Sequence, residues 1–381
     1  YLLPEWSGWQ VALGLNGMQQ VNDNKAEEAL IPAYRLFDLG SYVYLQKNYN
    51  RFTVSGGIRF DYRYLRSKEY TEDGDIKFEA FNRSFSNLSG SAGISYEAAK
   101  SLTLKLNIAR GFRAPSIAEL ASNGAHEGTN RYEYGASNLR SETSMQIDQG
   151  IELHTSHLSL SVSGFINSID HFIFYRKLES VFGGDSIIVH DDDRLMAFQF
   201  NQAKAFLYGA ECNMDLHPHP LDWLHFENTF SYVRGVFKEP IEGVRNLPLI
   251  PAARWLTQFR GEFFRQGKSL KNVSISVELD NNFTQNKAFT AYRTETITPG
   301  YSLVNFSVST DMQKNRQKLF TFLFTINNLT DVAYQNHMSR LKYTDINPLT
   351  GREGVYNMGR NFSFKILVPL SFELKYHQPQ G

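Results

Sequence analysis

The sequence predicts an all-β protein, an antiparallel transmembrane β-barrel, and alternation and length are the observations that predict it. In residues 51–64 every even position but one is apolar, and every odd position is polar or glycine. Because successive side chains of a strand point to opposite faces, this segment has one apolar and one polar face. It is longer than an average strand of about five or six residues, and it suits a tilted strand that crosses a bilayer.

The same alternation recurs along the chain, and the connections between the alternating segments fall into two classes. Further alternating segments are residues 102–109, 158–167, 273–280, 320–327 and 361–372. Tight connections are expected at 48–50, 97–100, 155–156, 217–221, 265–269 and 312–316. Long polar connections are expected at 20–32, 67–81, 113–141, 178–194, 237–251, 283–299 and 343–357. Short and long connections alternate strictly, which is typical of outer-membrane barrels and not of soluble sandwiches. The count predicts about fourteen strands that begin and end on the short-turn side.

Composition supports this fold class and excludes others. The 39 basic and 39 acidic side chains cancel, so no net field attracts nucleic acid, and we expect no nucleic-acid partner. Aromatic residues make up 14% of the chain, as two interfacial girdles would require. Mean hydropathy is −0.37, and no run of about eighteen apolar residues is present, which excludes a helical membrane protein. The single cysteine, Cys212, excludes an internal disulfide.

The alternation also predicts which side chains face lipid and which face the lumen. The side chains expected to point outward are Phe52, Val54, Ile58, Phe60, Phe320, Phe322, Phe324, Phe362, Phe364 and Ile366. Those expected to point into the lumen are Arg59, Asp61, Lys105, Thr321 and Lys365. A short helical turn is expected near 116–121, after a Gly-Phe-Arg-Ala-Pro turn.

Several motifs, in order along the chain, resemble one family. Residues 106–120 read LNIARGFRAPSIAEL, residues 137–148 read SNLRSETSMQID, and residues 246–255 read NLPLIPAARW. Residues 326–334 read INNLTDVAY, and residues 359–372 read GRNFSFKILVPLSF. Each motif is weak alone, but as an ordered set the chain resembles the bacterial TonB-dependent outer-membrane receptors over nearly its whole length.

The resemblance implies a barrel of twenty-two strands, filled by an N-terminal plug that carries a TonB-binding box. Residues 1–381 then correspond to the C-terminal portion of the barrel, and the first eight strands and the plug are missing from this chain. The implied location is the outer membrane of a Gram-negative bacterium, and the implied partners are outer-membrane lipid, the TonB energy-transducing complex and a small-molecule or metal cargo. Fourteen strands leave two edges unpaired, so either the chain is a piece of a longer barrel or its edges pair in a non-native way.

One external loop bears on the cargo. Residues 123–135 read NGAHEGTNRYEYG, which resembles a loop of family members linked to zinc or other transition-metal uptake. Neutral imidazole and carboxylate groups suit such metals, so a metal site is predicted from His126, Glu127, His190 and Asp192. His337 is expected on a rising strand near the same mouth, in a segment, 335–341, that resembles the penultimate strand of those relatives.

Other interpretations remain open from the sequence. Arg131, Tyr132 and Tyr134 of the same loop equally suit contacts to a siderophore or cobalamin, and the candidate cargoes are an iron-siderophore, zinc and haem. His217 and His219, in the His-Pro-His-Pro segment at 217–220, look like a metal clip, but they fall in a short turn on the side opposite the external loops, and their prolines favour turn geometry. No nucleophile elbow, P-loop, HExxH or EF-hand pattern is present, so neither an enzyme nor a resident cofactor is expected. A passive porin is the main alternative, and a soluble all-β binding module is the third.

Overall fold

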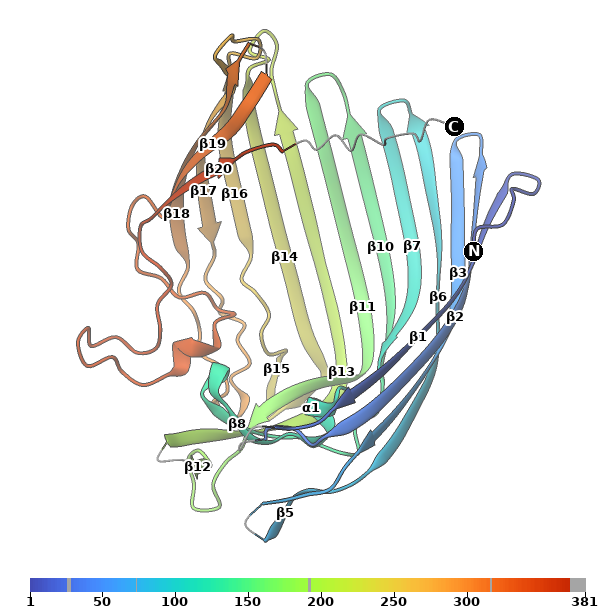
Figure 1. Cartoon of the computed structure of the whole chain (residues 1–381), viewed down its shortest axis with the longest axis vertical. Coiled ribbons are helices and arrows are strands. Elements are labelled where there is room, and N and C mark those ends of the chain that lie inside the picture. Colours follow the sequence, from blue (N-terminus) through green and yellow to red (C-terminus); the bar gives the residue numbers. More distant parts are fainter. Residues whose placement is uncertain (26–28, 73, 191–192, 316, 371–381) are drawn as a thin grey trace, which may run out of the picture.

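A computed structural model describes residues 1–25, 29–72, 74–190, 193–315 and 317–370. Over that span the chain forms one large, curved and mainly antiparallel sheet, together with a small two-stranded sheet (Figure 1). The long strands are β1 (Trp9–Asn22), β2 (Tyr34–Tyr49), β3 (Phe52–Ser67), β6 (Asn82–Ala99), β7 (Leu102–Arg113), β10 (Glu142–His154), β11 (Leu158–Lys177), β13 (Asp193–Leu216), β14 (Leu224–Ile241), β16 (Arg254–Phe263), β17 (Leu270–Asn282), β18 (Tyr301–Lys314), β19 (Gln317–Asn327) and β20 (Asn361–Leu367). These fourteen strands confirm the predicted number.

Each long strand pairs antiparallel with the long strand that follows it, from β1 to β20. The long loops gather at the lower end of Figure 1 and the tight turns at the upper end, as predicted. The β2–β3 turn shows why the turns stay short. Asn50 there adopts φ 51°, a left-handed conformation that asparagine tolerates.

The long loops contain short strands and helices that the alternation of apolar and polar residues does not predict. They are β4 (Tyr70–Glu72), β5 (Asp75–Phe78), α1 (Ile117–Ala121), β8 (Asn123–His126), η1 (Glu127–Thr129), β9 (Arg131–Tyr134), β12 (Ile187–His190), β15 (Val244–Asn246), η2 (Ala291–Arg293) and η3 (Arg340–Tyr343). The predicted helical turn is α1, which begins with a capping box between Ser116 and Glu119. Among the described residues, no helix is long and apolar enough to span a membrane.

The two faces of the sheet differ as the alternation predicts. On one face, Phe52, Val54, Ile58 and Phe60 are exposed, as are Phe362, Phe364 and Ile366 of the last strand. Phe320, Phe322 and Phe324 are half-buried beside them, and the Phe324 and Phe364 rings lie 4.8 Å apart. The opposite face is polar: Arg59 binds Asp61, Lys105 binds Glu152 at 2.6 Å, and the Thr321 hydroxyl donates to Asp311. Neither Phe322 nor Phe364 is in a close-packed core, which is the arrangement that would have contradicted the barrel prediction.

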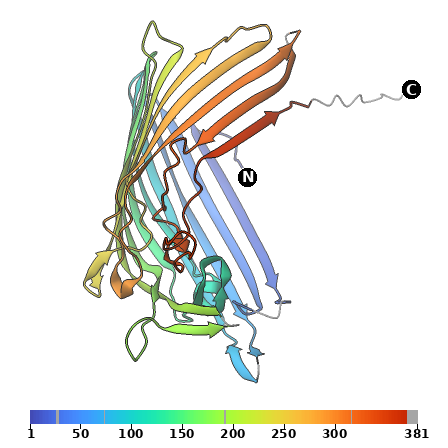
Figure 2. The ribbon, with the colours of Figure 1, turned by 90° about the vertical axis from the view of Figure 1, so that its left-hand side faces the viewer.

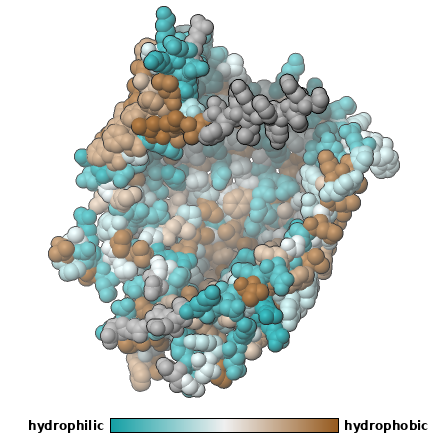
Figure 3. Space-filling model, in the orientation of Figure 1, coloured by the Kyte–Doolittle hydropathy of each residue, from teal (hydrophilic) through white to brown (hydrophobic). Residues whose placement is uncertain are grey.

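The sheet is open. Over the described residues, the only long-strand partner of β1 is β2, and the only one of β20 is β19. Figure 3, in the orientation of Figure 1, shows a hollowed centre with hydrophilic residues along much of the lower rim. Strand edges of this kind need a partner, because an unpaired edge leaves a row of unsatisfied backbone groups.

Buried apolar side chains gather at the long-loop end, in two clusters. One joins the β2, β3 and β6 strands to α1, and its fully buried members include Leu65 and Leu120. The other packs Phe174, Phe237 and Phe289 together with ring centroids 4.9 to 6.0 Å apart. These clusters hold the loops 114–141 and 283–300 against the wall.

The last long loop begins earlier than predicted. The expected loop was 343–357, but the chain leaves the sheet after β19 at Asn327 and rejoins it at Asn361. Asn328 ends the strand because its side chain exchanges two hydrogen bonds with the Val332 backbone, and its φ is 52°. Figure 2 shows the segment 328–360 on the hollow side of the curved sheet.

Candidate functional site

The strand β9 sorts the predicted binding residues onto two faces. β9 pairs antiparallel with β8 and parallel with the start of β13, where Arg131 lies opposite Met196. Alternation then puts Arg131 and Glu133 on the buried face, where they are 4% and 7% exposed. Tyr132 and Tyr134 point to the other face, with their ring centroids 5.0 Å apart. The four side chains therefore belong to two different surfaces.

Arg131 is held by aromatic rings from two neighbouring strands. Its guanidinium carbon lies 4.4 Å from the ring centroid of Tyr175 and 4.6 Å from that of Phe198. Its Nε lies 3.5 Å from Glu133 Oε1, which gives the buried cation a counter-charge. Arg340, from the last long loop, also approaches the Tyr175 ring, at 5.0 Å. Two arginines from separate loops therefore meet on one tyrosine.

This arrangement borders a cavity of about 300 Å³ at the long-loop end, which we call the arginine–aromatic cavity. Its lining includes Arg131, Tyr175, Phe198, Arg293, Arg340 and Tyr343. Acidic groups border it too, but Asp185 is already bound by Lys177 at 3.1 Å and by Arg293 at 2.9 Å. The cavity thus combines guanidinium donors with aromatic surfaces.

Beneath it, a buried polar cluster fixes the last long loop to the segment 283–300. Glu295 is 4% exposed and accepts hydrogen bonds from the backbone N–H groups of Leu249 and Phe289, at 2.6 and 3.0 Å. Lys342 donates to the Thr298 hydroxyl and to the Thr296 carbonyl. Burial lowers the pKa of the Lys342 ammonium group below its ordinary value, against the opposing charges of Glu295 and Glu353.

His337 belongs to this buried polar cluster, and its predicted location on a rising strand is wrong. It lies in a turn of the loop, 4% exposed, with Nδ1 2.8 Å from Thr298 Oγ1 and Nε2 3.6 Å from Glu295 Oε2. The turn replaces a strand because the chain has already left the sheet at Asn328. His337 also borders a second cavity, of about 480 Å³, on the polar face beside the Arg254–Asp280 ion pair.

Of the predicted metal ligands, His126 and His190 contact different residues. His126 Nδ1 lies 3.1 Å from Glu133 Oε1, so its carboxylate neighbour is Glu133, and the backbone of Glu127 lies in η1. His190 lies at the end of β12, with its ring centroid 6.2 Å from that of Tyr132, and Asp192 lies outside the described residues. Burial raises the pKa values of Tyr132 and Tyr134 above the ordinary phenol value. The metal set from His126, Glu127, His190 and Asp192 stays a prediction.

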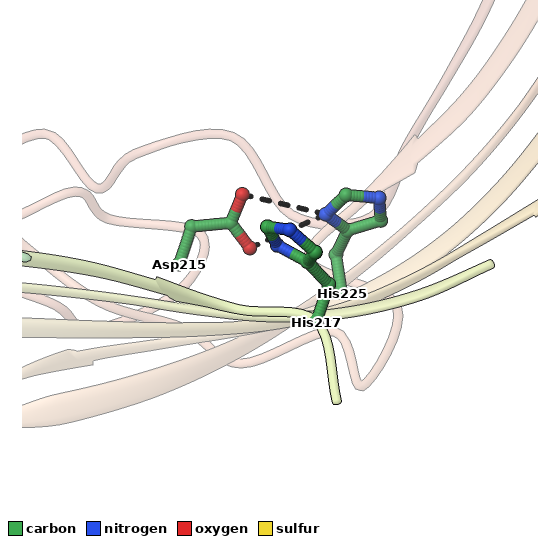
Figure 4. Close-up of side chains that lie close together, drawn as sticks. All are labelled: Asp215, His217 and His225. Carbon is green, nitrogen blue, oxygen red and sulfur yellow. Dashed lines mark hydrogen bonds and ion pairs between the residues drawn. The ribbon is translucent and has the colours of Figure 1, made fainter. Parts of the chain in front are cut away.

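Sequence reasoning missed a cluster at the opposite end of the strands. Asp215, His217 and His225 each place one metal-ligating atom within 4.8 Å of the others (Figure 4). It is the one group of three or more potential ligands found among the described residues. A signal was available, because His217 and His225 stand symmetrically about the turn that joins β13 to β14. The sequence interpretation considered a metal clip from His217 and His219, but the prolines favoured a turn, and Asp215 and His225 were not recognised as neighbours.

Comparison with known proteins decides the family. Residues 6–329 match the family described as "TonB dependent receptor-like, beta-barrel", which is most of the chain. The chain belongs to the TonB-dependent receptor β-barrel family. This membership confirms the resemblance carried by the sequence motifs.

Solved structures show the same fold at low sequence identity. The chain is similar to the copper transporter OprC, with a TM-score of 0.74, 17% identity, and 96% of this chain and 55% of that chain covered. It is also similar to the FrpB iron transporter from Neisseria meningitidis, with a TM-score of 0.66, 13% identity, and 96% and 53% coverage. It is also similar to the ferric yersiniabactin uptake receptor FyuA from Yersinia pestis, with a TM-score of 0.65, 14% identity, and 96% of this chain and 52% of that chain covered. The chain spans about half the length of each of these structures.

Proposed function

We propose that this chain is part of the wall of a TonB-dependent transporter in the outer membrane of a Gram-negative bacterium, and that its cargo is a metal chelate. The apolar face would contact lipid, and the polar face would line the lumen. Energy would come from the TonB complex acting through a plug, as the family membership suggests. The proposed role is transport and needs no enzymatic activity.

The arginine–aromatic cavity is the observation that carries the choice of a chelate. Many metal chelates carry negative charge and flat conjugated rings, so guanidinium donors and aromatic faces are the groups that recognise them. Arg131 and Arg340 supply the guanidinium groups. The aromatic faces come from Tyr175, Phe198 and Tyr343. Three of the similar structures are named for copper, iron and ferric yersiniabactin transport, which agrees with a metal-containing cargo.

The test measures binding to the full-length receptor in detergent. Three probes are used: a ferric catecholate siderophore, a ferric hydroxamate siderophore and haemin. A charge-assisted hydrogen bond is worth about 1.5–3 kcal/mol, so Arg340→Gln is expected to weaken binding of the preferred probe by about tenfold or more. The matched control is Arg352→Gln, because Arg352 stacks on Tyr356 in the same loop outside the cavity. No binding of any probe, or equal losses in both variants, would contradict the proposal.

A free metal ion is the second candidate cargo, and the His126–Glu133 contact favours it. Against it, Arg131 lies 3.5 Å from the same Glu133 oxygen, so a cation there would meet a fixed positive charge. Calorimetry with zinc on the wild type and on His126→Ala separates the two candidates. Loss of a zinc site in His126→Ala would support a free metal ion as the cargo. Unchanged zinc binding would leave a metal chelate as the preferred cargo.

A further inference from the structure

Three histidines lie side by side at the short-turn end of the polar face. The last paired residues of β13 and β14 are Leu216 and Phe226, so the same register places His217 opposite His225. On the other side, the His217 backbone N–H donates to the His157 carbonyl at 3.0 Å. His157 lies in the turn just before β11, His217 directly follows β13, and His225 lies near the start of β14, so the pairing of these neighbouring strands brings the three histidines together. Asp215, two residues before His217, points to the same face.

The side chains of Asp215, His217 and His225 converge, as Figure 4 shows. His225 Nδ1 lies 3.3 Å from both carboxylate oxygens of Asp215, and the His217 and His225 ring centroids are 5.3 Å apart. The three potential ligand atoms are within 4.8 Å of one another. Around a zinc ion, ligand atoms lie about 2.0–2.2 Å from the metal and therefore roughly 3.3–3.6 Å apart. Small side-chain rotations would bring the three atoms to that spacing.

The hydrogen bonds prepare His217 for metal binding. Its Nε2 lies 2.7 Å from the Ser156 carbonyl oxygen, and a carbonyl oxygen only accepts, so Nε2 carries the proton. The other nitrogen, Nδ1, then keeps its lone pair, and it is buried without a hydrogen-bond partner. Metal-bound histidines are usually oriented in this way, by a carbonyl or carboxylate that accepts from the second nitrogen. His217 Nδ1 is therefore a buried acceptor atom without a hydrogen-bond donor.

The surrounding charges accommodate a cation. His225 Nε2 is also buried without a hydrogen-bond partner, and Glu262 Oε1 lies 3.9 Å from it. Glu227 stands opposite Asp215 in the strand register. Arg260 binds both Glu227 and Glu262, and Arg265 also binds Glu262 at 3.0 Å, so both arginines are paired with carboxylates.

We propose that Asp215, His217 and His225 bind a divalent transition-metal ion, with Zn²⁺ the best fit. Two imidazole nitrogens and one carboxylate oxygen form a three-ligand set that leaves a fourth position for water. Calcium and magnesium prefer oxygen ligands, so the two histidines select against them. This site lies at the opposite end of the strands from the arginine–aromatic cavity and does not rest on the proposed cargo.

The test titrates the full-length receptor in detergent with Zn²⁺ by calorimetry and with Co²⁺ by visible absorption. Even the loss of a residue that only orients a ligand costs about 10–100-fold in metal affinity, so His217→Gln and His225→Gln are each expected to weaken Zn²⁺ by at least about that factor. The Co²⁺ spectrum should show ligand-field bands of a four-coordinate site, and these bands should vanish in both variants. The matched control is His219→Gln, since His219 lies in the same turn but is 71% exposed and outside the ligand set.

Folding is checked by heat-dependent migration of the barrel in gels, and Asp215→Asn supplies a third, nearly isosteric variant. Unchanged Zn²⁺ affinity in His217→Gln, His225→Gln and Asp215→Asn would overturn the proposal. So would a wild-type protein without Co²⁺ bands or zinc binding at micromolar concentration. A zinc signal that disappears only in His126→Ala belongs to the long-loop end and would also count against this site. Failure of all chelate probes would leave the result at this site unaffected.

Discussion

The two ends of the barrel wall hold their charged groups in different ways. At the long-loop end, Arg131, Glu295 and Lys342 are each at most 6% exposed, and aromatic clusters pack around them. At the short-turn end, His217 and His225 are only partly buried, and the neighbouring charges are half-exposed. A long loop supplies enough chain to cover a charge and satisfy it, whereas a tight turn does not. The difference teaches that the long loops enclose their charged side chains, whereas the tight turns cover theirs only in part.

The largest expected effect comes from the aromatic cluster at the long-loop end. Phe237 is fully buried and contacts the rings of Phe174 and Phe289. Phe237→Ala should destabilise the folded protein by about 3–5 kcal/mol, because it leaves a cavity that the cluster cannot fill. Denaturant unfolding of the full-length receptor in detergent measures this change.

The control for this variant comes from the short-turn end. Phe263 stacks against Trp223 at 5.2 Å, but Trp223 is 40% exposed. Since no closed cavity forms there, we expect Phe263→Ala to lower the free energy of unfolding by less than half as much as Phe237→Ala does. Equal losses of unfolding free energy in the two variants would contradict the proposed difference between the two ends.

A more local effect is expected from the buried carboxylate of the long-loop end. Glu295 accepts from the backbone of Leu249 and Phe289, and hydrogen bonds to charged groups are worth about 1.5–3 kcal/mol each. Glu295→Ala should therefore release these two amides, and hydrogen exchange should show their protection falling. The matched variant Glu262→Ala, at a half-exposed carboxylate of the short-turn end, should cost under about 1 kcal/mol. Retained protection at both amides would show that the cluster does not hold the loop.

The strands could be predicted from the sequence because each strand's pattern is local. Alternation and turn spacing predicted the fourteen strands, and the Gly-Phe-Arg-Ala-Pro turn predicted the short helix α1 that follows it. The start of the last loop was predicted too late. Alternation already fails at Asn327 and Asn328, which are both polar, but the segment 335–341 was assigned to a strand by its resemblance to relatives. The hydrogen bonds of the Asn328 side chain with Val332 show that the strand has ended before this segment.

The sites were less predictable, because their residues are distant in sequence. The position of Arg131 in a loop was visible, but its partners Tyr175 and Phe198 are chosen by the parallel pairing of β9 with β13. The short-turn cluster likewise needs the β13–β14 register, which places His217 opposite His225. Composition shows how many histidines the chain has, and only the pairing of strands shows which ones meet.

The smallest expected effect is a pH dependence at the long-loop end. Burial lowers the pKa of Lys342, so between that lowered value and the ordinary value of 10.5 the undocked loop binds more protons than the docked loop. The stability of the docked loop should therefore rise with pH across this window. Burial also raises the pKa of Tyr343 to about 12, above its ordinary value of 10.0, so the docked loop should lose stability above about pH 10. The two effects together predict a maximum on the alkaline side of neutrality.

Pulsed hydrogen exchange at the Val355 amide, which donates to the Leu341 carbonyl, follows the docking of this loop. Protection, corrected for the intrinsic exchange rate, should increase from neutral pH to about pH 9.5. Lys342→Met removes the titrating group while keeping the apolar stem, so the variant is expected to dock less firmly but to show no rise. The short-turn amide of Gln313, bound to the Ser269 carbonyl, is the internal reference and should show no comparable rise. If protection of the Val355 amide rises equally in Lys342→Met, or falls in the wild type, the pH dependence comes from another group. The buried lysine would then not explain the pH dependence of the long-loop end.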